Sequence, residues 1–197
     1  MADLVERPET APQLSPTAVR WTRRDCAAFE QAGILTYRYE LVEGVINSMG
    51  QNLPHANAIR LLIGWLVAAI GIDFFFTQAT IDVRPEDNPT NAPEPDAIVL
   101  NCPAGDLTGI PTPANIRLLI EAANTTLSYD LTTKAALYAR AGIVEYWVLS
   151  LSERRLYVHR LPTDGTYKDI NVYREDKQVV SLGTPPLALT ISTQFPS

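Results

Sequence analysis

Apolar residues recur along this chain with two periods, one near 3.6 residues and one of two residues. The helical period and its end signals mark three segments, 22–33, 54–69 and 131–141. Thr22 and Asp130 stand where side chains cap the start of a helix, and Gly33 and Gly142 stand where a helix stops. The pattern therefore predicts three helices, the last of them capped by Asp130.

Short apolar or alternating runs predict strands in the rest of the chain. Residues 37–50 alternate on both sides of a turn at Glu43-Gly44, which is typical of a hairpin. The other runs expected to be strands are 73–85, 96–101, 116–123, 144–151, 156–161 and three short runs within 165–192. A helix between two buried apolar strands indicates an α/β crossover, with antiparallel strands at the flanks of the sheet.

Length and composition agree with a single domain. The chain has 197 residues, 46% of them hydrophobic, which is enough for a substantial core. Residues 1–16 contain three prolines and no apolar period, so we expect a flexible arm there and one domain over 17–197. The expected fold class is α/β, with a central mixed β-sheet flanked by helices.

Charge and cysteine content narrow the function classes. The net charge of −6 argues against a broad basic surface for nucleic acid, although a local basic patch beside an acidic metal site is compatible with it. Cys26 and Cys102 form no C-x-x-C motif, which indicates neither a disulfide scaffold nor a zinc site. The apolar run 61–72 is short for a bilayer, and the start of the chain does not resemble a signal peptide. We expect a soluble, cytoplasmic protein with no membrane partner.

Two acids stand in the predicted central strands. Alternation along 116–123 places residues 116, 118 and 120 on one face and residues 117, 119 and 121 on the other. Glu121 is thus a carboxylate in an apolar strand, where its charge needs compensation. Asp96 enters another central strand, and if the two strands are neighbours, both carboxylates can bind one ion. Mg²⁺ prefers such hard oxygen ligands.

Lys134 adds a cation near these acids. It lies on the predicted third helix, where it could stabilise negative charge developing during phosphodiester hydrolysis. A structural alternative is an i,i+4 ion pair with Asp130, of about 0.3–0.5 kcal/mol. Asp96 could equally be a plain strand-entry acid, and Glu121 could pair with Arg117 or Lys134. Glu94 is interpreted as a loop residue.

An ordered series of motifs extends this pattern over about residues 22–170. The motifs are Tyr39-Glu40-Leu41-Val42-Glu43-Gly44, Pro54-His55, Pro95-Asp96, Leu119-Ile120-Glu121, Asp130 with Lys134 and Tyr138, and Ala141-Gly142-Ile143-Val144-Glu145-Tyr146-Trp147-Val148. In this order they resemble the Uma family of putative restriction endonucleases, which belongs to the PD-(D/E)xK nuclease superfamily.

The resemblance implies a restriction-endonuclease-like fold and a Mg²⁺- or Mn²⁺-dependent endonuclease acting on DNA as a homodimer. It implies that Asp96 and Glu121 hold the metal and that Glu40 completes the acidic pocket, with Glu43 as a competing choice. His55 would be a helper. A superfamily lysine is expected at position 123, where this chain has Ala123, so the resemblance assigns the role of that lysine to Lys134.

Two other functions remain open. The low basic charge and Ala123 favour a non-catalytic binding or assembly module with the nuclease fold, and a third hypothesis is a hydrolase of another phosphate ester. Tyr146 and Trp147 are interpreted as core residues. The scattered arginines are interpreted as solvated surface, with phosphate contact as the alternative; they are Arg23, Arg24, Arg60, Arg154, Arg155 and Arg160.

Overall fold

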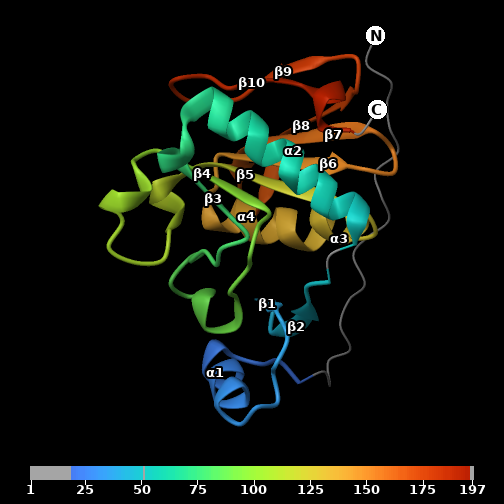
Figure 1. The fold of residues 1–197 in the computed structure, drawn as a ribbon. Coiled ribbons are helices and arrows are strands. Elements are labelled where there is room, and N and C mark those ends of the chain that lie inside the picture. The colour runs from blue at the N-terminus through green and yellow to red at the C-terminus, as the bar shows by residue number, and fades with distance from the viewer. Residues whose placement is uncertain (1–18, 51, 196–197) are drawn as a thin grey trace.

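The computed structural model describes residues 19–50 and 52–195, and Figure 1 shows their arrangement. The predicted flexible arm, residues 1–16, lies outside the described residues. The helices are α1 (Arg23–Gln31), α2 (Leu53–Ile70), α3 (Leu127–Tyr129) and α4 (Ala135–Ala141), and a π-helical turn (Asp130–Lys134) joins the last two. Short 3₁₀ turns lie at 72–74, 88–90, 104–106, 113–115 and 191–194.

A six-stranded mixed sheet forms the centre of the fold, which confirms the predicted class. Its strands are β3 (Phe75–Thr77), β4 (Ala97–Leu100), β5 (Ile116–Ala123), β6 (Glu145–Ser150), β7 (Arg155–Thr163) and β8 (Thr166–Arg174), in that spatial order. β5 and β6 pair in parallel, and the other neighbours are antiparallel. The parallel pair is joined by the helical segment from α3 to α4, the crossover that the sequence predicts.

Alternation along the strands builds one core on each face of the sheet. On one face Leu119, Tyr146 and Val148 pack with the buried side of α4. On the other face Trp147 and Leu149 pack with Leu62 and Leu66 of α2. Figure 1 shows α2 and α4 on opposite sides of the sheet. The predicted core positions Tyr146 and Trp147 are fully buried, one in each layer.

Two smaller hairpin-like pairs flank the main sheet. β1 (Tyr39–Val42) and β2 (Val45–Ser48) form the predicted hairpin, with the left-handed residues Glu43 and Gly44 in its turn. An isolated bridge between Leu41 and Ala92 joins this hairpin to the segment before β4. The second pair consists of β9 (Gln178–Val180) and β10 (Ala188–Thr190).

Helix ends follow local capping chemistry at α1, α2 and the end of α4. Thr22 accepts a hydrogen bond from the backbone N–H of Asp25, so it caps α1 as predicted. The Asp25 carboxylate accepts one from the N–H of Thr22, which completes a capping box. Asn52 caps α2 through the N–H of His55. Gly142 ends α4 in the left-handed conformation, with φ of 81°.

Two strand predictions are wrong in detail. Of the run 73–85 only β3 is a strand, because the chain then leaves the sheet in a left-handed turn at Gln78 and runs toward α1. The strict alternation along β5 also fails at its start. An irregularity beside Val99 pairs Leu100 with Ile116, and Ile116 therefore packs on the same face as Leu119.

Among the described residues, α2 is the one helix long and apolar enough to cross a membrane by length and composition. It has 18 residues, more than the apolar run 61–72 suggests. A single such helix is a weak indication, because core helices of soluble proteins have the same properties. Ala58, Ile59, Leu62 and Leu66 are its buried side.

Candidate active site

Asp96 immediately precedes β4 and Glu121 lies on the neighbouring strand β5, as the sequence requires if the two acids are to share an ion. β4 and β5 are antiparallel, and Ala97 pairs with Ile120, so Asp96, one residue before β4, lies at the level of Glu121. Both carboxylates lie on the sheet face that packs against α4, because they alternate with Ala97 and Ile120 of the opposite core. Both are about 4% exposed.

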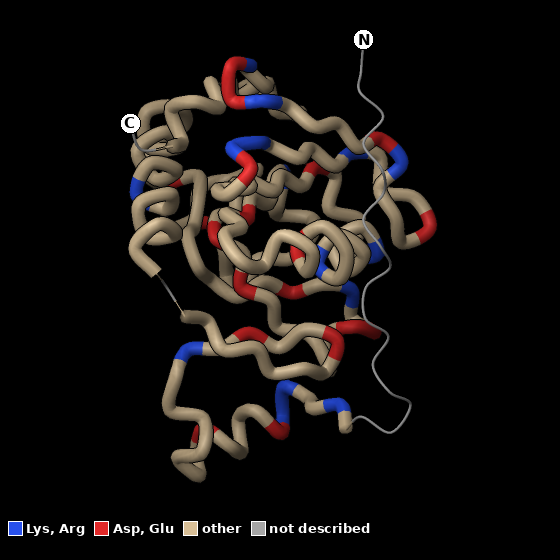
Figure 2. Tube along the Cα trace, turned by 90° about the vertical axis from the view of Figure 1, so that its right-hand side faces the viewer, with Lys and Arg blue, Asp and Glu red and all other residues tan. Residues whose placement is uncertain are grey.

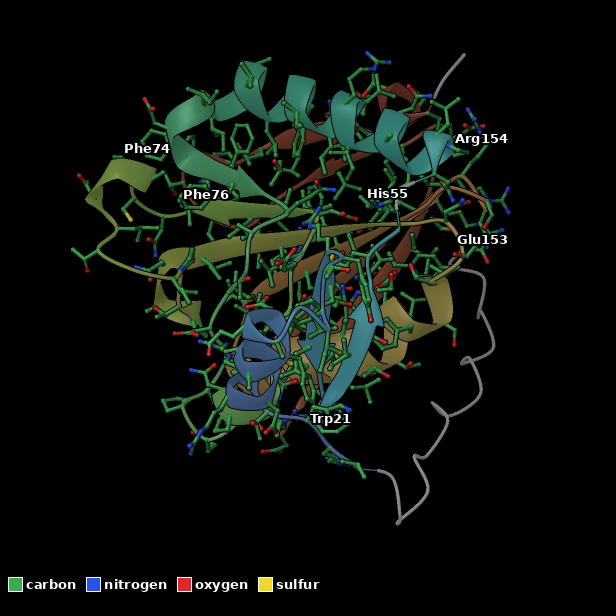
Figure 3. All side chains as sticks on the ribbon, turned by 60° about the horizontal axis from the view of Figure 1, so that its bottom comes forward. Trp21, His55, Phe74, Phe76, Glu153 and Arg154 are labelled. Carbon is green, nitrogen blue, oxygen red and sulfur yellow. The ribbon has the colours of Figure 1, made fainter. Side chains whose placement is uncertain are left out.

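Backbone and side-chain donors orient the Asp96 carboxylate through one of its oxygens. Oδ2 accepts a hydrogen bond from the N–H of Ala122 at 2.8 Å and lies 3.0 Å from Nε2 of His55. His55 belongs to the first turn of α2 (Figure 3) and so reaches Asp96 from the other side of the sheet. The hydrogen bond to Asp96 raises the pKa of His55, although burial opposes the shift.

Lys134 bridges Glu121 and Glu40, two of the acids predicted for the site. Its Nζ lies 2.9 Å from Oε1 of Glu121 and 2.9 Å from Oε2 of Glu40, whereas Oδ1 of Asp130 is 4.0 Å away. The helical i,i+4 pair is therefore the longest of the three contacts. Tyr138, one turn further along α4, donates its hydroxyl to the same Oε1 of Glu121 at 3.2 Å.

Among the residues that the structure describes, the site holds four carboxyl groups and a single lysine. Burial raises the pKa of Glu121 well above its usual range, Lys134 opposes this shift, and Asp96, Asp130 and Glu40 reinforce it. Burial also works against the charge on Lys134, but the surrounding carboxylates outweigh it and hold the pKa of the ammonium well above its usual range. The lysine is therefore charged, and the acids around it favour a further cation.

Asp130 does not cap a helix, so that prediction is wrong. The helical segment begins at Leu127, and Asp130 lies inside it in the π-helical turn, 3% exposed. Its Oδ2 accepts the hydroxyl of Thr126 at 2.6 Å. Burial raises its pKa to about 6, with Lys134 and Thr126 opposing. Asp130 lines the cavity as a fourth carboxylate, beside Glu40, Asp96 and Glu121.

A cavity of about 400 Å³ opens onto these groups. Its wall includes Arg38, Asn47 and Tyr129, none of which the sequence singled out. Arg38 precedes Glu40 by two residues in extended chain, a spacing that puts both side chains on one face and could have signalled it. Asn47 faces Glu40 across the hairpin and donates to the Tyr129 hydroxyl at 2.9 Å.

Glu94 has a defined structural role, which corrects its interpretation as a plain loop residue. Oε2 of Glu94 accepts hydrogen bonds from Nε and Nη2 of Arg38 at 2.9 and 2.7 Å, and Oε1 accepts a hydrogen bond from the hydroxyl of Thr80. The backbone N–H of Glu94 donates to Oε2 of Glu40 at 3.3 Å. Glu94 thus holds Arg38 at the wall of the cavity.

Lysines and arginines are scattered over the described chain, as Figure 2 shows. Two of the six predicted surface arginines have internal partners. Arg23 pairs with Asp82 at 2.6 Å and donates to the carbonyl oxygen of Asn91. Arg160 donates hydrogen bonds from Nε and Nη2 to Oε1 of the fully buried Glu145. For these two the prediction of a solvated surface side chain is wrong.

Ala123 shows why this strand has no lysine two residues after Glu121. Its side chain lies on the same face as Glu121, is fully buried and belongs to the core layer that contains Ala135 and Leu137 of α4. A small residue lets the helix pack close to the strand at this point. Lys134, immediately before α4, supplies the cation from the helix side instead.

The donor set fits Mg²⁺ as two carboxylates rather than as a complete cage. No group of three or more His, Cys, Asp or Glu side chains in residues 19–50 and 52–195 is arranged so that it could hold a metal ion. Mg²⁺ needs only one or two protein carboxylates, because it keeps several water ligands. Within that part of the chain, Asp96 accepts hydrogen bonds through Oδ2 and Glu121 through Oε1. Oδ1 and Oε2 are thereby left for a cation.

The chain matches a known protein family over the part that contains this site. The sequence profile of the family Uma2, described as "Putative restriction endonuclease", matches residues 29–192, a span that includes every site residue described above. The chain belongs to the Uma2 family. Among curated proteins, none matches the chain.

Solved structures agree with this assignment at the level of the fold. One match is the crystal structure of a putative nuclease belonging to DUF820 from Anabaena variabilis ATCC 29413. The TM-score is 0.57 at 15% sequence identity, over 84% of this chain and 96% of that one. Family membership and the fold together indicate a restriction-endonuclease-like nuclease.

Proposed function

We propose that this Uma2 protein is a Mg²⁺- or Mn²⁺-dependent endonuclease that hydrolyses phosphodiester bonds in DNA, working in the cytoplasm as a homodimer. The observation that carries the proposal is the convergence of Asp96, Glu121 and Lys134, from three separate elements, on one cavity. A buried cluster of this composition is costly for stability, since each buried charge must be compensated. Such a cost is typical of functional sites.

In the proposed reaction Asp96 and Glu121 would hold the metal ion, since each has one carboxylate oxygen that accepts no hydrogen bond in the described chain. A bound Mg²⁺ or Mn²⁺ would polarise the phosphate and lower the pKa of a water molecule. His55 and the N–H of Ala122 fix the orientation of Asp96. Lys134, charged and held by Glu40 and Glu121, stabilises negative charge that develops on the phosphate.

A binding or assembly module that retains the nuclease fold is the alternative, favoured by Ala123 and by the net charge of −6. Such a module gains nothing from an intact, buried set of four carboxylates and one lysine. Metal binding therefore separates the two functions, and cleavage of a small phosphodiester without cleavage of duplex DNA would indicate the third hypothesis.

The test is calorimetric titration of Mn²⁺ into wild type and Asp96→Asn, followed by plasmid cleavage with the same samples. We expect wild type to bind Mn²⁺ and cut, and Asp96→Asn to lose binding and to cut on the order of 10²–10³-fold more slowly. Asp106→Asn, an exposed acid on a 3₁₀ turn, is the matched control and should behave as wild type. A wild type that binds no Mn²⁺ would refute the metal-dependent mechanism.

A further inference from the structure

The ammonium of Lys134 lies at a point where carboxylates from three distant segments meet. Glu40 comes from β1 and Glu121 from β5, and each places one oxygen 2.9 Å from Nζ. Asp130, from the π-helical turn, is the third at 4.0 Å. The acidic cluster therefore already contains a bound cation, which is a side chain of the protein.

Burial distinguishes this arrangement from an ordinary ion pair. The side chains of Lys134, Glu40, Glu121 and Asp130 are each only 5–6% exposed. Lysine is rarely buried unless it is paired, and an exposed pair would contribute little stability. The ring of Tyr129, whose centroid is 5.9 Å from Nζ, further favours a cation at this position.

The two oxygens of Glu121 point to two separate cation positions. Oε1 accepts from Lys134 and from Tyr138, while Oε2 accepts no hydrogen bond from the described residues. A carboxylate shared in this way between two cations is what two-metal phosphodiesterases use, with the ions about 3.5–4 Å apart. Here the inner of the two positions is filled by the ammonium.

We propose that Lys134 is a resident cation that occupies the inner of two cation positions and so limits this site to one divalent ion. The outer position lies between Asp96 and Glu121, and for that ion the inference rests on the function proposed above. The inner position is formed by the two carboxylate oxygens of Glu40 and Glu121 that lie 2.9 Å from Nζ of Lys134. Removal of the lysine charge opens the inner position to a second divalent ion.

The experiment counts Mn²⁺ ions bound per chain by equilibrium dialysis. Lys134→Met keeps the length of the side chain without its charge, and we expect it to bind one Mn²⁺ more than wild type. The double variant Lys134→Met with Glu40→Gln should lose this additional ion, because Glu40 is an inner ligand. Lys177→Met removes an exposed lysine that pairs with Asp176 and should leave the count unchanged.

An equal count for Lys134→Met and wild type would overturn the inference, as would an additional ion that persists without the Glu40 carboxylate. The wild-type count is a separate result that tests the proposed function: one ion supports the outer site, and none refutes it. Both results can be obtained from the same set of samples.

If Lys134→Met is unstable without metal, thermal unfolding tests the same inference. The variant leaves Glu40 and Glu121 buried without their cation, so we expect a melting temperature below that of wild type in the absence of Mn²⁺. Saturating Mn²⁺ should raise it by more than it raises the wild-type value, because a second ion binds the folded state. A variant that stays unfolded in saturating Mn²⁺ would contradict the inference.

Discussion

At the scale of single residues, the partners of a buried carboxylate distinguish a structural acid from a candidate ligand. Glu145 is fully buried, and both of its oxygens are used within the protein. Oε1 accepts from Arg160 and from Nε1 of Trp147, and Oε2 accepts the N–H of Leu182 at 2.7 Å. Glu145 thus fastens the C-terminal segment to β6. Asp96 and Glu121 each use one oxygen, and the other is directed to cation binding in our proposal.

His159 makes the stability of the protein dependent on pH. It is buried between Tyr146 and Tyr167, and burial lowers its pKa from 6.5 to about 4. The unfolded chain binds a proton at this residue below pH 6.5, whereas the folded chain does so only near pH 4. The contribution of neutral His159 to stability is therefore complete above pH 6.5 and is lost as the pH falls toward 4.

We expect His159→Phe to remove this dependence. Between pH 7 and pH 4.5 the free energy of unfolding of wild type should fall by about 2–3 kcal/mol more than that of the variant. Urea denaturation at the two pH values measures the difference. Tyr167→Phe, in the same aromatic cluster, introduces no change in titration over this range and is the control. Identical pH dependence of wild type and His159→Phe would contradict a neutral buried histidine.

At the scale of elements, the helical segment after β5 carries the site residues that the strands do not supply. It runs from Leu127 to Ala141 and is interrupted by the π-helical turn that contains Asp130 and Lys134. π turns of this kind are rare and are often found at functional sites. In this turn Lys134 contacts the carboxylates of Glu40 and Glu121, and Oδ1 of Asp130 lies 4.0 Å from Nζ of Lys134. The left-handed Gly142 then ends the segment before β6.

Substitution by alanine should change the stability of the fold in opposite directions at Gly142, which ends α4, and at Gly64, which lies inside α2. Gly142→Ala forces a side chain into a left-handed conformation and should destabilise the fold by about 1 kcal/mol, although an added Cβ would meet no atom within 4 Å. Gly64→Ala, inside α2 and equally unobstructed, should stabilise it by about 0.5–1 kcal/mol. Thermal unfolding of both variants measures these effects. Changes of the same sign would contradict the assigned conformations.

At the scale of the whole molecule, the site depends on contacts between the hairpin β1–β2 and the main sheet. Glu40 reaches Lys134 because the bridge between Leu41 and Ala92 holds the hairpin beside the segment that enters β4. Arg140 of α4 pairs with Glu43 in the hairpin turn, which gives that acid a structural role and leaves Glu40 as the acid at the cavity. The hairpin and the sheet both contribute to the wall of the cavity, together with α2 and the helical segment after β5.

In the proposed function each cavity cuts one strand, so cleavage of both strands would require two copies of the chain. We expect the protein to sediment at twice the mass of a single chain at micromolar concentration and to convert supercoiled plasmid to the linear form. Sedimentation velocity with and without a DNA duplex, together with a cleavage time course, measures both properties. A single-chain mass under all conditions, with nicked circles as the final product, would contradict the homodimer.

The sequence by itself determined the features that depend on local order. Caps, turns and apolar periods placed α1, α2, the β1–β2 hairpin and the strands β4 to β7, because each follows from residues close together in the chain. The order of the motifs also singled out Asp96, Glu121, Lys134 and Glu40 as candidate site residues. Each of them lines the cavity.

The tertiary structure alone decided how these residues meet. Lys134 and Glu40 are far apart in the chain, and their contact depends on the order of strands and the attachment of the hairpin. Burial inside a π-helical turn made Asp130 part of the cavity instead of a cap, and Glu94 became the partner of Arg38. These contacts join side chains from distant segments of the chain, so a local sequence pattern cannot predict which side chains meet.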